Sequence, residues 1–158
     1  MVSEFSLIHS AQGPVLLLSN IFQGCTALLD TGALFPVWTK GDRLLKGIGG
    51  RFDFGDISFT GFGGECKASV YKLNFCLGNI IFPDMSILCI NDDAIPGYFL
   101  LSATMFYGCK YTIDNLNKKL WIDTYDNQVC RLLKIRNDKG KLYILYNDIS
   151  ADEMGDKI

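Results

Sequence analysis

The hydrophobic residues of this chain fall in short runs separated by turn residues, a pattern typical of a small β-barrel or sandwich. Two of these runs, residues 52–59 and 68–75, alternate apolar and polar positions, and a glycine-rich segment joins them. Period-two arms around glycines predict a long β-hairpin. Residues 80–90 are almost continuously apolar, which predicts a strand that is buried on both faces.

The remaining segments predict shorter elements. Strands are expected near residues 3–9, 15–21, 25–30, 34–38 and 98–101, and two further hairpins at 110–122 and 131–146. Ser102 is expected to cap one short α-helix that follows residues 98–101, whereas residues 44–50 look less regular. The last eight residues are polar and are expected to fray.

The composition favours an all-β fold, and a length of 158 residues suits one domain with a real core. The net charge of −2 predicts no basic surface for nucleic acid or an anionic membrane. No segment approaches the roughly 20 apolar residues of a membrane-spanning helix, and the N-terminus lacks the pattern of a signal peptide. We therefore expect a cytoplasmic protein with neither a membrane nor a nucleic-acid partner.

Six cysteines are scattered along the chain without a CxxC pair, and His9 is the single histidine. These spacings do not fit a zinc site, so we expect no metal and no cofactor. Without an export signal, the cysteines are expected to be reduced and mostly buried. A Cys-His catalytic pair would have to use His9 and has no supporting spacing.

One segment points to chemistry. Residues 27–33 read Ala-Leu-Leu-Asp-Thr-Gly-Ala, an apolar strand that delivers Asp30 onto a turn. Aspartic proteolysis needs two carboxylates about 3 Å apart that share one proton, because two like charges that close cannot both ionise. The motif occurs once, so a catalyst of this kind requires two identical chains. The alternative is an ordinary solvated turn between strands, although the apolar flanks argue against it.

The motif at 28–33, the glycine-tipped hairpin and the apolar strand that leads into a short helix at 100–106 together resemble the retropepsins. These are the single-domain, homodimeric aspartic proteases of retroviruses and retrotransposons, which have bacterial relatives. The resemblance covers roughly residues 14–123 and implies an all-β acid-protease barrel with one short α-helix. Residues 1–123 would form the protease domain, and residues 124–158 a C-terminal extension with a β-hairpin.

The resemblance also implies roles for individual residues. Asp30 would face its symmetry mate in a homodimer and act as acid and base on an extended polypeptide substrate. Thr31 would lock the two active-site turns together, Gly32 would let backbone amides approach the carboxylates, and Ala33 would keep a subsite wall small. A flap over the substrate would be formed by Gly61, Phe62, Gly63 and Gly64.

Two features depart from the family pattern. Ser102 stands where the family usually has a glycine, and serine would be a poor substitute if the backbone there needs a positive φ. A second glycine cluster, Gly47-Ile48-Gly49-Gly50, also looks like a flap tip. It follows Asp30 too closely to leave room for a strand and a flap arm, so the cluster at 61–64 is preferred.

Two other functions stay open. The first is a catalytically inactive module that keeps the fold and the dimer and binds peptides or drives assembly. The second is a monomer in which residues 1–13 or 124–158 cover the dimer surface. The complete Asp-Thr-Gly motif favours the aspartic endopeptidase over both.

Overall fold

The computed structural model describes residues 2–10, 13–17, 26–30, 32–61, 64–92, 98–125 and 133–146. The strands are β1 (Val2–Ser10), β2 (Gly13–Leu17), β3 (Thr26–Asp30), β4 (Val37–Trp38), β5 (Arg51–Gly61), β6 (Gly64–Leu77), β7 (Ile80–Cys89), β8 (Tyr98–Ser102), β9 (Lys110–Asp114), β10 (Lys119–Asp123), β11 (Leu133–Asp138) and β12 (Lys141–Tyr146). Two short helices complete these elements, an α-helix α1 (Arg43–Gly47) and a 3-10 helix η1 (Ala103–Phe106). The expectation of an all-β chain is confirmed.

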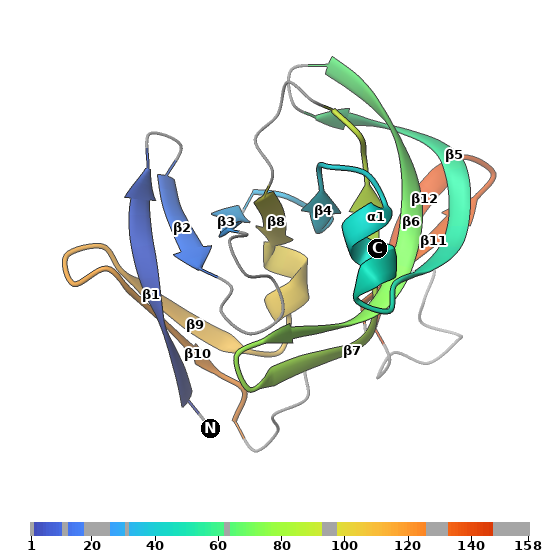
Figure 1. Cartoon of the computed structure of the whole chain (residues 1–158). Helices are drawn as coiled ribbons and strands as arrows, with labels where there is room; N and C mark the ends of the chain where they lie inside the picture. Colours follow the sequence, from blue (N-terminus) through green and yellow to red (C-terminus); the bar gives the residue numbers. More distant parts are fainter. Residues whose placement is uncertain are drawn as a thin grey trace.

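Within these residues, ten strands form one sheet in the order β5-β6-β7-β4-β8-β3-β2-β1-β10-β9, and β11 pairs with β12 in a second sheet. The large sheet is strongly curled (Figure 1). The β1–β2 hairpin rises on one side of the central strands β3, β8 and β4, and the β5–β6 hairpin rises on the other side (Figure 1).

The centre of the sheet brings together segments that are far apart in the sequence. Strand β8 runs parallel to β3, so that Asp30 lies beside Ser102. The same β8 pairs with β4 in the antiparallel sense, and β4 runs parallel to β7. Although β3 and β4 follow one another in the chain, β8 is therefore inserted between them. This insertion positions the loop after Asp30 against the end of β8.

The long hairpin predicted from the period-two runs is confirmed as β5 and β6, with Gly61 paired to Gly64 at its tip. The register shifts between Phe52 and Ile57, and Asp56 in this stretch adopts a left-handed φ of 57°. Such bulges strengthen the twist of a strand and bend it. The hairpin therefore curves instead of extending flat from the sheet.

The α-helix lies elsewhere than predicted. Residues 44–50 were expected to be irregular, but α1 begins at Arg43 and buries Leu45 completely. The segment expected to be an α-helix after residue 101 is instead one turn of 3-10 helix. The glycine cluster after α1 closes this helix, because Gly49 has a φ of +91° and Gly50 N–H donates to Leu45 O at 2.7 Å. A Cβ on Gly50 would lie 2.5 Å from that oxygen, so Gly49 and Gly50 are required by the helix end, and the segment at 47–50 does not form a hairpin tip.

The strand expected at 34–38 shrinks to the two residues of β4. Pro36 has no N–H to donate to a neighbouring strand, which explains why the pairing starts after it. Its carbonyl still accepts a hydrogen bond from Leu88 N–H at 2.9 Å. The other predicted strands are found where they were expected, and the two C-terminal hairpins are confirmed. Residues 18–25 and the final eight residues lie outside the described part of the chain.

The core is rich in aromatic side chains. Phe75, Phe82 and Phe99 are fully buried, and Trp38 stacks on Phe99 with 4.4 Å between the ring centroids. Large side chains of this kind account for much of the apolar area that folding removes from water. Among the described residues, no helix is long and apolar enough to cross a membrane.

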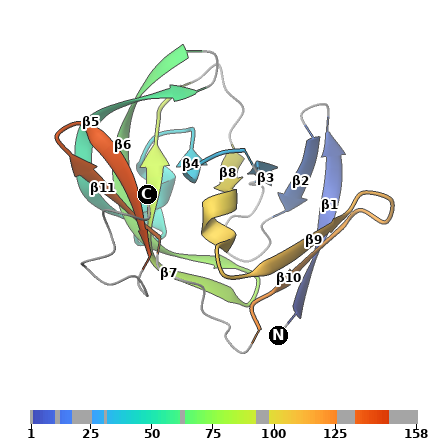
Figure 2. The ribbon, with the colours of Figure 1, turned by 180° about the vertical axis from the view of Figure 1, so that it is seen from behind.

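The C-terminal hairpin shares this core. Strands β11 and β12 lie alongside β5 and β6 in both views (Figures 1 and 2). Ile135 of β11 is 2% exposed and belongs to the same apolar cluster as Val70 and Leu88, and Ile144 of β12 joins the main core. Residues 133–146 therefore pack as an integral layer against the large sheet.

Candidate functional site

Asp30 ends strand β3, in which buried and half-buried residues alternate. Because successive side chains of a strand point to opposite faces, Asp30 shares a face with Leu28, while Ala27 and Leu29 enter the main core. The carboxylate Oδ1 of Asp30 accepts a hydrogen bond from Gly32 N–H at 3.0 Å. The Asp30 carbonyl accepts a second one from Ala33 N–H at 3.2 Å. These two bonds, from Gly32 and Ala33, fix the carboxylate of Asp30 at the end of the strand.

Gly32 directs its amide at the Asp30 carboxylate of the same chain. Its Cα is exposed, and a Cβ added there would lie 3.5 Å from Asp30 Oδ1, which is an ordinary van der Waals contact. The turn of one isolated chain therefore does not require glycine at this position. Glycine would be required at this position only if another molecule, such as a second chain, packed closely against the turn. Ala33 is half-buried against the second apolar cluster, and Thr31 lies outside the described residues.

A chain of hydroxyl groups ties the loop after Asp30 to the end of β8. Thr104 Oγ1 donates to Leu34 O at 2.6 Å, so its proton is used. The 2.7 Å contact between Ser102 and Thr104 therefore has the Ser102 hydroxyl as its donor. Ser102 is fully buried and extended, with φ of −86° and ψ of 155°. Serine fits this backbone without strain, so the departure from glycine costs nothing in backbone conformation.

Ser102 occupies the N-cap position of η1, but its side chain makes no capping hydrogen bond to the helix backbone. The prediction that Ser102 caps a helix is therefore wrong in its detail. Its hydroxyl is directed to Thr104 and, through Thr104, to the loop that carries Leu34. No local pattern in the sequence indicates this link, because Leu34 and Thr104 are far apart along the chain.

The predicted flap residues lie at the tip of the β5–β6 hairpin. Gly61 and Gly64 are the last pair of the ladder, and Phe62 and Gly63 lie outside the described residues. A Cβ on Gly64 would meet nothing within 4 Å, so the tip is open on that side. In the described part of the chain, the hydrogen bond to the Asp30 carboxylate comes from the Gly32 amide, and no second carboxylate is bonded to it.

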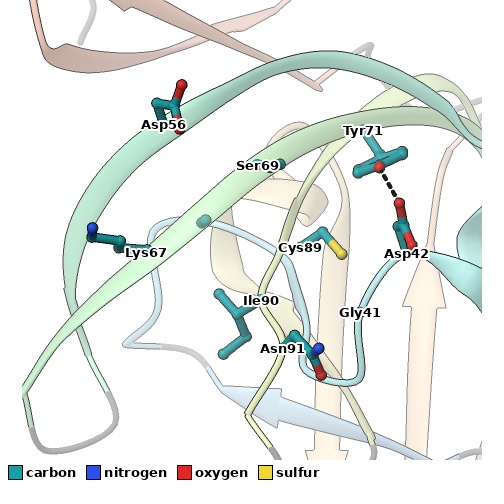
Figure 3. A pocket seen from close by; sticks show the side chains of 10 residues that line it. Gly41, Asp42, Asp56, Lys67, Ser69, Tyr71, Cys89, Ile90 and Asn91 are labelled. Carbon is teal, nitrogen blue, oxygen red and sulfur yellow. Dashed lines mark hydrogen bonds between the residues drawn. The ribbon is translucent and has the colours of Figure 1, made fainter.

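A separate polar pocket of about 330 Å³ lies between the β5–β6 hairpin and the segments at 41–42 and 89–91. Figure 3 shows Lys67 and Ser69 on β6, Asp56 on β5, and Asp42 pointing toward Tyr71. The Tyr71 hydroxyl donates to Asp42 Oδ2 at 2.6 Å, and Lys46 Nζ forms an ion pair with the same oxygen at 2.8 Å.

The hydrogen bonds around Asp42 shift the nearby ionisable groups. Lys46, and after it Tyr71, lower the pKa of Asp42 by hydrogen bonding to its ionised form. Burial, together with the hydrogen bond to Asp42, raises the pKa of Tyr71 to about 12. Burial also raises the pKa of the Cys89 thiol to about 12. At neutral pH Asp42 is charged, and Tyr71 and Cys89 are neutral.

Four of the six cysteines lie in the described residues, and none of these four forms a disulfide. Cys89 is buried, whereas Cys66, Cys76 and Cys109 are half-buried, so the expectation of mostly buried cysteines is wrong for three of them. The described residues contain no group of three or more His, Cys, Asp or Glu side chains close enough to hold a metal ion.

Comparison with known proteins gives no match: no family model, no curated protein and no solved structure matches this chain. The functional assignment therefore rests on the residues of the chain itself.

Proposed function

We propose that this chain is an aspartic endopeptidase that hydrolyses extended polypeptides, with an active site formed by Asp30 from two identical chains. The observation that carries the proposal is the position of Asp30. An apolar strand in the centre of the sheet ends in one carboxylate, and a backbone amide holds this carboxylate within a tight turn. Its neighbour across the parallel pair is the fully buried Ser102.

The chemistry follows from two such carboxyl groups meeting across a two-fold axis. One stays protonated, because two carboxylates at that distance cannot both ionise. The ionised group takes a proton from water as the water attacks the scissile carbonyl, and the protonated partner donates to the developing oxyanion. The tetrahedral intermediate then collapses, the peptide C–N bond breaks, and the carboxyl group that took the proton from water returns it to the leaving amine. The shared proton favours activity at mildly acidic pH. Apolar side chains on the face of Asp30, among them Leu28 and Leu100, would border the substrate.

The β5–β6 hairpin supports the same proposal. It is long, curved by its bulges and tipped by glycines, so it suits a flap that bends over an extended peptide. The substrate backbone would pair with the hairpin tip as an added strand. The central insertion of β8 beside β3 holds the other wall, because Thr104 fixes the loop that follows Asp30.

A peptide-binding or assembly module without turnover is the second candidate, and one observation favours it. Leu34 and Tyr107 are large hydrophobic residues with exposed fractions of 64% and 62%. Both residues are hydrogen-bonded to Thr104. The Thr104 hydroxyl donates to the Leu34 carbonyl, and the Thr104 carbonyl accepts a hydrogen bond from Tyr107 N–H at 3.4 Å. Apolar surface at this position suits contact with another chain whether or not a reaction follows.

The test is cleavage of a mixed peptide library from mildly acidic to neutral pH, with the oligomeric state of each sample measured by mass. Asp30→Asn is compared with the wild type and with Asp114→Asn. Asp114 is a matched control because its carboxylate also holds a turn, accepting Leu116 N–H and Asn117 N–H at 3.0 Å. We expect a dimer whose cleavage is lost in Asp30→Asn and kept in Asp114→Asn. A folded dimer without cleavage would favour the binding module. Cleavage that survives in Asp30→Asn, or that comes from a monomer, would refute the shared dyad.

A further inference from the structure

A second cavity, of about 540 Å³, lies beside α1. Its described lining residues are Trp38, Lys40, Arg43, Leu44, Gly47 and Ile48. This volume is typical of a small-molecule site, and so is the composition of mainly apolar walls with a few polar groups. Leu44 and Ile48 also pack against the main core, which makes the apolar wall part of the fold itself.

This cavity lies on the face of the sheet opposite to Asp30. Residues that are paired across neighbouring strands share a face, so Trp38 lies on the same side as Phe99 and Ala27. Asp30 lies on the other side, with Leu28. A ligand beside α1 would therefore not touch the proposed catalytic carboxylate.

The rim of the cavity is positively charged. Two of its described lining residues, Lys40 and Arg43, are basic and none is acidic. The Lys40 ammonium donates to the Asp92 carbonyl at 3.1 Å, and the acidic residue nearest in sequence is Asp42. The Asp42 carboxylate is already engaged by Lys46 and by Tyr71. Among the described residues, no hydrogen bond or ion pair engages the exposed guanidinium of Arg43. In a chain with a net charge of −2, this rim would attract an anion.

Trp38 adds an unusual feature to the floor of the cavity. Its side chain is only 4% exposed, and its indole Nε1–H is one of two buried side-chain polar atoms in the described residues without a hydrogen-bond partner. Buried donors in folded proteins are nearly always paired, because an unpaired one has lost water without compensation. The indole N–H of this lining residue therefore stands out as a buried donor without a partner.

We propose that this cavity binds a small carboxylate that carries an apolar body. The carboxylate would pair with Arg43, for which a guanidinium is well suited because its fork of N–H groups matches two carboxylate oxygens. The apolar body would lie against Leu44 and Ile48, over the face of Trp38. A cationic ligand is disfavoured by the rim, and a neutral apolar ligand would leave Arg43 without a partner.

Two sources carry this chemistry, a free short-chain carboxylate and the C-terminal residue of a peptide. Octanoate represents the first, and a short peptide that ends in leucine represents the second. N-acetyl-leucine has the features that both sources share. N-acetyl-leucinamide is the matched neutral probe, because it keeps the apolar body and lacks the charge.

The chain carries its own reporter for this site. It has two tryptophans, so a Trp121→Phe background leaves Trp38 as the sole tryptophan emitter. We expect a saturable change in Trp38 emission on titration with N-acetyl-leucine. N-acetyl-leucinamide should bind at least about tenfold more weakly, which is the affinity that the loss of one charge-assisted contact removes. Titration with octanoate and with the peptide then shows which source binds more tightly.

Two variants locate the ligand. Arg43→Gln should weaken the binding of N-acetyl-leucine by about tenfold or more. Lys46→Gln, which removes the same charge from the same helix at a residue that does not line the cavity, should change it far less. Gly47→Leu should block binding without harming the fold, because a Cβ at Gly47 meets nothing within 4 Å. The proposal is overturned if no carboxylate gives a saturable signal, if the amide binds equally well, or if Gly47→Leu binds like the wild type. None of these results depends on Asp30 or on peptide cleavage.

Discussion

Replacing Thr104 by valine should break the link that fixes the loop after Asp30. Valine keeps the shape of threonine but removes the hydroxyl that accepts from Ser102 and donates to Leu34 O. The Ser102 hydroxyl is fully buried and would lose its partner. An unpaired buried hydroxyl costs about 1 to 3 kcal/mol, so we expect Thr104→Val to lower the free energy of unfolding by about 2 kcal/mol.

The magnitude can be separated into its parts with a double-mutant cycle. Ser102→Ala removes one hydrogen bond but leaves Thr104 bonded to Leu34 O, so it should cost about 1 kcal/mol. In the double variant no hydroxyl remains to be buried alone. The double variant should therefore lose about 2 kcal/mol, whereas the two single losses add up to about 3 kcal/mol. The difference is a coupling energy of about 1 kcal/mol between the two hydroxyl groups.

Urea unfolding followed by circular dichroism measures each of these values. With a slope of about 2 kcal/mol per molar, Thr104→Val should lower the urea midpoint by about 1 M. Thr112→Val is the matched control, because Thr112 is exposed on β9 and should change stability by less than about 0.5 kcal/mol. Strictly additive losses for Ser102→Ala and Thr104→Val would refute the hydroxyl link, as would a Thr104→Val variant as stable as the control.

Three further predictions test other parts of the structure. Gly32→Ala should unfold at the same urea concentration as the wild type, because its Cβ fits at 3.5 Å from Asp30 Oδ1. Peptide cleavage should nevertheless fall by roughly 100-fold if a second chain approaches this turn. Unchanged cleavage would contradict that approach. The pKa of Tyr71 is raised to about 12, so its contribution to stability is complete below pH 10 and is lost as the pH rises toward 12. In urea unfolding measured at several pH values, Tyr71→Phe should lack this alkaline loss of stability. If Tyr71→Phe loses the same stability as the wild type, the loss comes from other groups. Phe99→Ala should cost about 3 to 5 kcal/mol in the same unfolding assay, because Phe99 is fully buried beneath Trp38, and a loss below 1 kcal/mol would contradict the packing.

The hairpins could be predicted from sequence because their signal is local. Alternating residues and turn glycines mark β5 and β6, whereas the register shifts between Phe52 and Ile57 were not predicted. Helix α1 was missed because five residues give little helical periodicity and only Leu45 is fully buried. The reason for Gly49 and Gly50 became visible only with the helix end that they close.

For the candidate site, the sequence predicted Asp30 and its turn but not the surroundings. The contact of Thr104 with Leu34, and that of Tyr71 with Asp42, join residues from separate elements. Such contacts depend on the order of strands in the sheet, which no local pattern encodes. The cavity beside α1 was missed for the same reason, since its tryptophan comes from β4 and its arginine from a helix that was not expected.

The insertion of β8 between β3 and β4 has a consequence for how the protein is made. During synthesis β3 and β4 leave the ribosome long before β8, so the central position between them stays empty while the intervening hairpin emerges. Pairings between segments so distant in sequence form slowly, because a large loop must close first. The loop that follows Asp30 gains its hydrogen bond from Thr104 to Leu34 O only at that late step. A nascent or truncated chain that lacks β8 would therefore carry the Asp-Thr-Gly motif without a fixed site, which would delay any activity until the sheet is complete.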